Sequence, residues 1–574
     1  MLKSRLHLFR MTLGGVSLIL LFQNCGKGFD VGTSLIKGNG LSSGSSTAPN
    51  SGLPGSPGSI GLGLKCVSSE PPKFNRRVWR LNGEQYINSL RAAFPGLPTT
   101  TVISNPFNDS STGHFNNNSD GLRLGPILTQ GLITSSEAFS KLAAPIATKS
   151  FPCLATTLTP DCASKVVNSL GVSLFRRPLL ATEVADYSQF LISNSTQFGS
   201  DGLALLIQTL VISPHFLFRY EVGDPSTGLL NSYEKASLIS YSAANTSPDA
   251  ELMMAAQNNI LETPDQIKKQ FLRLAQKSGR FENTIDFMRQ YLHYGDIGTK
   301  TKDTAVFPQF TPQLGQTLVK ETDALIISLL KSGQATVKDL LSTKSVMISA
   351  ETASVYGLDN IALPPAGQMA LTTITDGSRA GILTQPSFLA SMGAKNRTSP
   401  VHLGATIRNS LLCTEVPPPP LNVPSLDATS EVVYLTQRSR LAAHSAPACI
   451  GCHRYMDPIG LGFEGYDSMG KVRTMEGGSA VDTSGEVLLT KSPLDGKFSG
   501  GVELGNRMSE SGVVHACYIR NSSLYITGSY DLSGGDCFIQ SIQDTMGDQS
   551  KASMVEIFAN IYAKFLTLPR STGL

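Results

Sequence analysis

The chain has 574 residues, of which 41% are hydrophobic and only 16% are charged, so it can bury the cores of several domains. Its formal net charge is +3, but the basic residues Lys3, Arg5 and Arg10 all precede Cys25. Without these three, the 47 basic residues become 44, which equals the 44 acidic ones. This neutrality excludes a dedicated polyanion binder, and we expect no nucleic-acid partner.

The first 25 residues predict an export signal, because a basic start precedes an apolar run at 11–22 that is too short to span a bilayer. The string Leu21-Phe22-Gln23-Asn24-Cys25-Gly26 resembles a bacterial lipoprotein signal, although Gln23 and Asn24 replace the usual small residues. We expect lipidation of Cys25, which anchors the chain to a lipid bilayer on the periplasmic or outer-membrane side of the cell envelope. An uncleaved anchor and ordinary secretion are the alternatives.

Residues 26–72 are rich in Gly, Ser and Pro and predict a flexible tether. Helical periodicity dominates after the tether, and strand alternation is weak. The segments with this periodicity are 81–91, 160–222 with its apolar end at 203–220, 233–241, 264–276, 282–294 and 312–330. The fold class is therefore mostly α, a multi-domain helical scaffold with little β structure. The expected helical domains cover 73–148, 149–225 and 226–360.

One pentapeptide contains the main candidate residues for binding a cofactor: Cys449-Ile450-Gly451-Cys452-His453. Two cysteines one helical turn apart, followed directly by histidine, form the attachment motif of c-type haem. Cys449 and Cys452 then bond one porphyrin edge, and His453 is the proximal iron ligand. A Cys449–Cys452 disulfide and a zinc site with a distant fourth ligand are the alternatives. We assign 375–475 as a minimal cytochrome c-like haem-binding domain, in which the proline run 417–420 is an extended connector before a helix at 432–443.

Several residues are candidates to complete the haem site. A second axial ligand is Met392, Met469 or His444, unless the sixth position is open or holds water. The guanidinium of Arg473, with Lys471 and Arg440 as further candidates, suits a haem propionate. Candidates to orient the Nδ1–H group of His453 are Asp457, Glu464, Asp467 and a backbone carbonyl.

Six other cysteines suggest disulfides in an exported chain: Cys66, Cys153, Cys162, Cys413, Cys517 and Cys537. Local pairing favours Cys153–Cys162 and Cys517–Cys537, which leaves Cys66 to reach Cys413 or remain free. Free buried thiols are the alternative. For the last region, 476–574, we predict a helical domain. It should begin with a short hairpin or loop at 477–489, followed by helices at 502–509, 513–520 and 554–565.

Ordered motifs along the body resemble the planctomycete-type cytochrome-associated family, which consists of consecutive domains of unknown function with a C-terminal Cys-x-x-Cys-His haem motif. The strongest stretch runs from Cys449 to Arg473 and includes Asp457-Pro458-Ile459-Gly460. Other matching strings are Phe175-Arg176-Arg177-Pro178-Leu179, Ser213-Pro214-His215-Phe216-Leu217-Phe218-Arg219-Tyr220-Glu221, Ser247-Pro248-Asp249-Ala250-Glu251-Leu252, Arg379-Ala380-Gly381-Ile382-Leu383-Thr384 and Arg397-Thr398-Ser399-Pro400-Val401. The resemblance covers roughly residues 75–570. It implies one covalent haem c and an all-helical layout, but no established reaction.

We therefore expect an exported, lipid-anchored c-type haem protein that acts in electron transfer or as a component of a haem-dependent oxidoreductase. It should have a redox partner protein, and the sequence leaves open whether it is an enzyme. The alternative is a non-redox structural or ligand-binding surface lipoprotein in which Cys449 and Cys452 form a disulfide.

Overall fold

The computed structural model describes residue 66 and residues 74–107, 109, 115–117, 119, 122, 124–279, 281–358, 362–414, 416, 435–528 and 535–571. These residues belong to one compact unit, 60–574. The expected export signal with Cys25, the tether apart from Cys66, and the proline run 417–420 lie outside the described residues. No helix in the described part is long and apolar enough to cross a membrane.

The N-terminal part begins with strand β1 (Arg77–Arg80) and ends with strand β2 (Phe218–Glu221), and the two strands pair antiparallel. A group of helices lies between them in the sequence. Its helices are α2 (Gly83–Ala93), α3 (Pro126–Ser150), η1 (Pro152–Ala155), α4 (Pro160–Phe175), α5 (Ala181–Phe198), α6 (Asp201–Ile212) and α7 (Pro214–Leu217). The expectation of a helical apolar stretch over 203–220 is wrong at its end. Helix α6 stops at Ile212 because Pro214 disfavours the helical conformation of Ser213. The chain then makes the short helix α7 and continues into β2.

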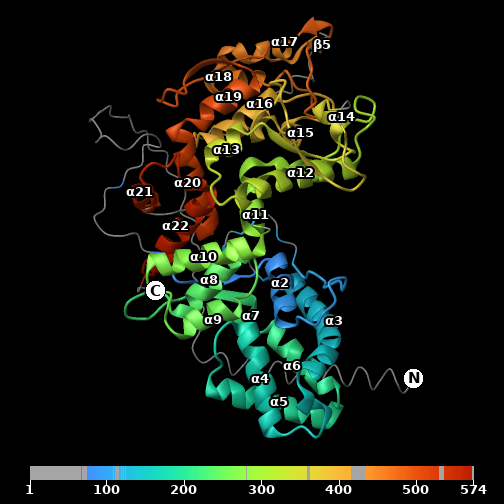
Figure 1. The fold of residues 1–574 in the computed structure, drawn as a ribbon, viewed down its shortest axis with the longest axis vertical. Helices are drawn as coiled ribbons and strands as arrows, with labels where there is room; N and C mark the ends of the chain where they lie inside the picture. Colours follow the sequence, from blue (N-terminus) through green and yellow to red (C-terminus); the bar gives the residue numbers. More distant parts are fainter. Residues whose placement is uncertain are drawn as a thin grey trace. The chain divides into compact units, whose positions relative to one another are not determined.

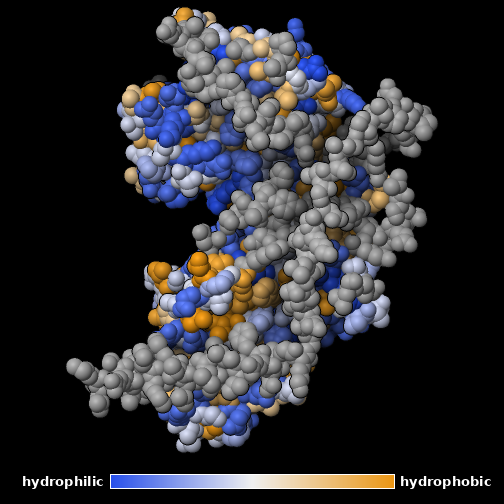
Figure 2. All heavy atoms as spheres, turned by 180° about the vertical axis from the view of Figure 1, so that it is seen from behind, coloured by the Kyte–Doolittle hydropathy of each residue, from blue (hydrophilic) through white to orange (hydrophobic). Residues whose placement is uncertain are grey.

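Helix α3 lies at the surface, since several of its apolar side chains are exposed. Ile127 is 88% exposed, and Ile133 and Leu142 are 39% and 46% exposed. On the face shown in Figure 2, apolar side chains gather in one area in the lower half of the view, while much of the other coloured surface is hydrophilic.

The middle of the chain confirms the helices expected from periodicity at 233–241, 264–276, 282–294 and 312–330. Its elements are α8 (Ser232–Ala244), α9 (Ala250–Gln257), α10 (Pro264–Ser278), α11 (Glu282–Leu292), η2 (Tyr294–Gly298), α12 (Pro312–Lys331), α13 (Val337–Ser342), β3 (Ser345–Ile348), α14 (Ala353–Tyr356) and β4 (Ala370–Thr373). Strands β3 and β4 pair antiparallel. Reciprocal capping boxes begin α8 and α10, at Asn231 and Thr263, which explains why these helix starts are well defined.

The region of the cysteine–histidine motif contains short helices. They are η3 (Ile382–Thr384), α15 (Pro386–Met392), α16 (Pro400–Thr406), the π-helical turn η4 (Ile407–Leu411), α17 (Gln437–Leu441), η5 (Ala442–Ser445) and α18 (Pro447–Leu461). The hairpin expected at 477–489 is represented by two small antiparallel ribbons, β5 (Met475–Glu476) with β6 (Ser479–Ala480) and β7 (Ser484–Val487) with β8 (Gly496–Ser499).

Four helices end the chain: α19 (Gly500–Ser509), α20 (Gly512–Thr527), α21 (Gly535–Met546) and α22 (Met554–Thr567). Helices α20 and α22 pack together, and α22 also packs on α10, which Figure 1 shows beside it. The ring of Phe287 on α11 contacts Tyr518, Tyr525 and Phe558 from these C-terminal helices. The C-terminal helices therefore complete the core of the middle region. The fold is mostly α, as expected.

Three disulfides join all six remaining cysteines. The expected local pair Cys153–Cys162 is present. The expected pair Cys517–Cys537 is wrong, because Cys413 bonds Cys517 and Cys66 bonds Cys537. Helix α20 packs against the π-helical turn η4, which brings Cys517 to Cys413, two residues beyond that turn. Tertiary packing, and not sequence proximity, decides these two pairs.

Candidate haem-binding site

Helix α18 places both thiols and the imidazole of the motif on consecutive turns. Pro447 occupies its first turn, where a missing N–H group costs nothing. Cys449 and Cys452 are half-buried, and neither is disulfide-bonded. Both thiols are thus available for bonds to a group outside the polypeptide.

Asp457 orients the imidazole of His453 from the next turn of the same helix. The Nδ1 atom of His453 lies 3.0 Å and 3.1 Å from the two carboxylate oxygens of Asp457. Since an ionised carboxylate only accepts hydrogen bonds, Nδ1 carries the proton, and the lone pair is on Nε2. Asp457 is only 6% exposed, so water competes little for this contact. Of the three carboxylates considered from the sequence, Asp457 is the one in contact with His453.

His444 shares the same carboxylate. Its Nδ1 lies 2.7 Å from Oδ2 of Asp457, and its ring centroid is 3.8 Å from that of His453. A porphyrin between two axial imidazoles needs a metal–nitrogen bond of about 2 Å on each side in addition to the ring radii. A porphyrin would not fit between the two rings as they are arranged, and the role of His444 as an axial ligand stays a prediction. His444, His453 and Asp457 also form a metal-compatible cluster, with ligand atoms within 4.8 Å of one another.

Glycines set the close packing of α18 on α16. A Cβ atom added to Gly404 would lie 1.9 Å from the carbonyl oxygen of Met456, and one added to Gly460 would lie 1.9 Å from that of Pro400. These two contacts define an antiparallel register between the helices. The register fixes the position of α18, and nothing in the motif itself pointed to it.

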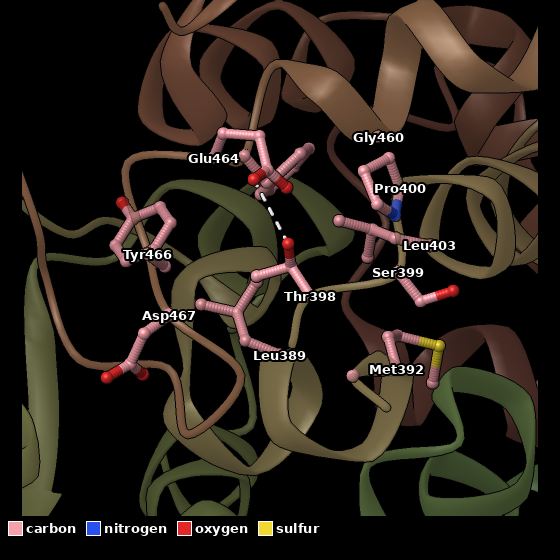
Figure 3. A pocket seen from close by; sticks show the side chains of 12 residues that line it. Leu389, Met392, Thr398, Ser399, Pro400, Leu403, Gly460, Glu464, Tyr466 and Asp467 are labelled. Atoms are coloured by element: carbon pink, nitrogen blue, oxygen red, sulfur yellow. Dashed lines mark hydrogen bonds between the residues drawn. The ribbon is translucent and has the colours of Figure 1, made fainter. Parts of the chain in front are cut away.

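Met392 lies in a pocket whose lining residues do not include His453. Its side chain is 2% exposed, and Leu403 and Gly460 line the same pocket, as Figure 3 shows. Gly460 is seven residues beyond His453, a helical rise of about 10 Å. Met469 is fully buried in a different apolar cluster, which also contains Ala390. The role of either methionine as axial ligand stays a prediction.

Arg473 is already bound by two carboxylates. Its Nη2 atom lies 2.6 Å from Oε2 of Glu464 and 3.2 Å from Oε1 of Glu476. Thr398 also donates to Glu464, across the pocket in Figure 3. Burial raises the pKa of Glu464 to about 7, although the charge of Arg473 opposes this rise. A propionate would have to compete with both carboxylates for Arg473.

The residues present fit a c-type haem by their donor chemistry. Two accessible thiols lie one turn apart, and an oriented imidazole with a basic Nε2 follows them. The sequence identified these three residues and included Asp457 among its candidates. It did not identify the shared role of His444 or the glycine contacts with α16.

Three family models match consecutive segments of the chain. Residues 162–221 match PSD5, a protein of unknown function (DUF1595), and residues 230–358 match PSD4, a protein of unknown function (DUF1592). Residues 379–476, which contain the site, match PSCyt3, a protein of unknown function (DUF1588). No curated protein and no solved structure matches the chain significantly. The chain thus contains, in consecutive order, the domains of the planctomycete cytochrome-associated type.

Proposed function

We propose that this chain carries one covalently attached haem c and acts in electron transfer or as a component of a haem-dependent oxidoreductase. The observation that carries the proposal is the geometry of α18. Its two unpaired thiols and the Asp457-oriented imidazole of His453 lie on one helix, while the other six described cysteines are paired.

Each residue has a defined task in this proposal. Cys449 and Cys452 hold the cofactor through two thioether bonds, and His453 presents Nε2 to the iron. Asp457 keeps Nδ1 protonated, fixes the ring orientation and increases the basicity of the ligand. When bound, haem supplies a one-electron couple.

We further propose that the chain is exported and anchored through acyl groups on Cys25. The three disulfides support an oxidising compartment, because such bonds rarely persist in the cytosol. A Cys25→Ser variant should move from the membrane fraction to the soluble fraction of the cell envelope. Equal fractionation of both proteins would contradict lipid anchoring at this residue.

The haem proposal is tested by producing the full chain in a host with c-type haem maturation machinery. The mature protein should gain the mass of one haem, and its Soret band should survive acid–acetone extraction. A Cys449→Ala/Cys452→Ala variant should lose both signals. The matched control, Cys153→Ser/Cys162→Ser, removes two other cysteines and should keep them.

The haem proposal is overturned if the wild-type chain gains no mass while another c-type cytochrome matures in the same host. In that case a mass loss of two hydrogens at Cys449 and Cys452 would identify the disulfide form.

A transition-metal site is the second candidate, favoured by the cluster of His444, His453 and Asp457. Two imidazoles and a carboxylate suit zinc or iron, with bonds of about 2.0–2.2 Å for zinc. Metal analysis of the haem-free chain tests this second proposal. It predicts one equivalent of metal in the wild type and none in His444→Ala.

A further inference from the structure

A rare backbone turn places an arginine beside the motif helix. The π-helical turn η4 continues α16 directly, and Arg408 is its second residue. Single π-helical turns inside α-helices frequently mark functional sites. The chain therefore interrupts regular helix at the point where it presents this side chain.

The glycine contacts set the direction in which α16 runs along α18. Gly404 meets Met456 and Pro400 meets Gly460, so the two helices are antiparallel, and the end of α16 that leads to Arg408 points toward the half of α18 that carries the thiols. A direct contact agrees, because Nη1 of Arg408 lies 3.4 Å from the carbonyl oxygen of Tyr455. The guanidinium carbon is also 5.5 Å from the centroid of the Tyr455 ring. Arg408 thus contacts α18 within two residues of His453.

The positive charge of Arg408 is buried without a carboxylate partner among the described residues. The side chain is 5% exposed, and its second hydrogen bond, 2.8 Å long, goes to the carbonyl oxygen of Leu488. Burial lowers the pKa of Arg408, while the more distant charge of Asp495 opposes this effect. Arg473 differs, since two carboxylates neutralise it. Neutral carbonyls alone stabilise a buried cation only in part.

We propose that the buried charge of Arg408 raises the midpoint potential of the haem bound at Cys449 and Cys452. The inference rests on the proposed haem function. A fixed positive charge near the iron favours the reduced form, which carries one positive charge less, and a low-dielectric surrounding strengthens the interaction. The carbonyl contacts with Tyr455 and Leu488 hold the guanidinium against α18 and would keep it at a constant place relative to a haem bound there.

The test measures the midpoint potential of the full-length holoprotein at pH 7. Arg408→Gln should shift the potential to a lower value, and Arg408→Lys should keep most of the wild-type value because it retains the charge. Asp495→Asn removes the opposing charge and should shift the potential upward by a smaller amount. Arg176→Lys is the matched control, because Arg176 is also buried and binds carbonyls, but in the N-terminal helical part. It should not change the potential.

The outcomes separate this inference from the haem proposal. Absence of covalent haem from the wild type defeats the proposed function itself. Covalent haem with equal potentials in the wild type and Arg408→Gln overturns the role of Arg408 alone. If Arg408→Gln fails to fold, the potentials of Arg408→Lys and Asp495→Asn test the charge effect in its place. Shifts of both in the same direction would indicate a structural disturbance and overturn the charge effect.

Discussion

Helix α20 holds Cys517 fully buried and bonded to Cys413, whereas α18 holds Cys449 and Cys452 half-buried and unpaired. Helix α20 is surrounded by protein, and its Tyr518 and Tyr525 lie against the aromatic rings of the core. Helix α18 packs tightly on α16 through its C-terminal half, and the turns that carry its thiols are less buried. The bond between Cys413 and Cys517 thus secures the fold, while Cys449 and Cys452 stay available for a ligand.

The largest effect on stability is expected when each of the two cysteine pairs is removed in turn. Cys413→Ser/Cys517→Ser opens a loop of 104 residues and should lower the free energy of unfolding by about 4–5 kcal/mol in the chain-entropy model. Cys449→Ala/Cys452→Ala should leave the stability of the haem-free chain within about 0.5 kcal/mol. Urea denaturation of the haem-free proteins measures both. Equal destabilisation would show that the α18 cysteines also support the fold.

A glycine substitution tests the packing of α18. Gly460→Ala places a methyl group against the carbonyl of Pro400 and should cost about 1–3 kcal/mol through overpacking. Gly451→Ala on the same helix is the control, because an added Cβ there meets nothing within 4 Å. Its better helix propensity should stabilise the haem-free chain by up to about 1 kcal/mol. Thermal unfolding of both variants should therefore shift in opposite directions.

The carboxylate behind His453 controls the character of the iron ligand. Asp457→Asn removes the negative charge at Nδ1 and weakens the basicity of the imidazole, so the oxidised haem should lose stabilisation. We expect a rise in midpoint potential of about 60 mV for a tenfold effect. His444→Ala should lower the potential, because Asp457 then interacts with His453 alone. Potentiometric titration measures both, and shifts of equal sign would contradict the shared-carboxylate arrangement.

The smallest effect concerns pH and the surroundings of α20. Burial raises the pKa of Asp286 from 3.8 to about 6, although hydrogen bonds from Tyr525 and Gln290 oppose this rise. The unfolded chain releases this proton first, so the group reduces stability as the pH rises from about 4 to 6. Asp286→Asn cannot ionise and should remove that loss, so the variant should be more stable relative to the wild type at pH 7 than at pH 4. Denaturation midpoints at pH 4 and pH 7 check the result. An equal difference between variant and wild type at both pH values would contradict it.

Local patterns predicted much of the fold and part of the site. Apolar spacing identified α8, α10, α11 and α12, because the buried face of an amphipathic helix appears in the sequence as apolar residues three and four positions apart. The Cys153–Cys162 pair was also predictable, since nine residues separate its members. The strand at Phe218–Glu221 was not, because its partner β1 lies at the other end of the N-terminal part.

The sequence by itself determined the helical class, the two thiols at helical spacing, the adjacent imidazole and a carboxylate one turn later. Each of these depends only on residues within a few turns of one helix. Only the tertiary structure decided which partners Cys66 and Cys413 each bond. It also decided the contact between His444 and Asp457 and the position of Arg408 beside α18. These contacts join segments that are distant in the sequence or separated by a turn, and their geometry is set by how the helices pack.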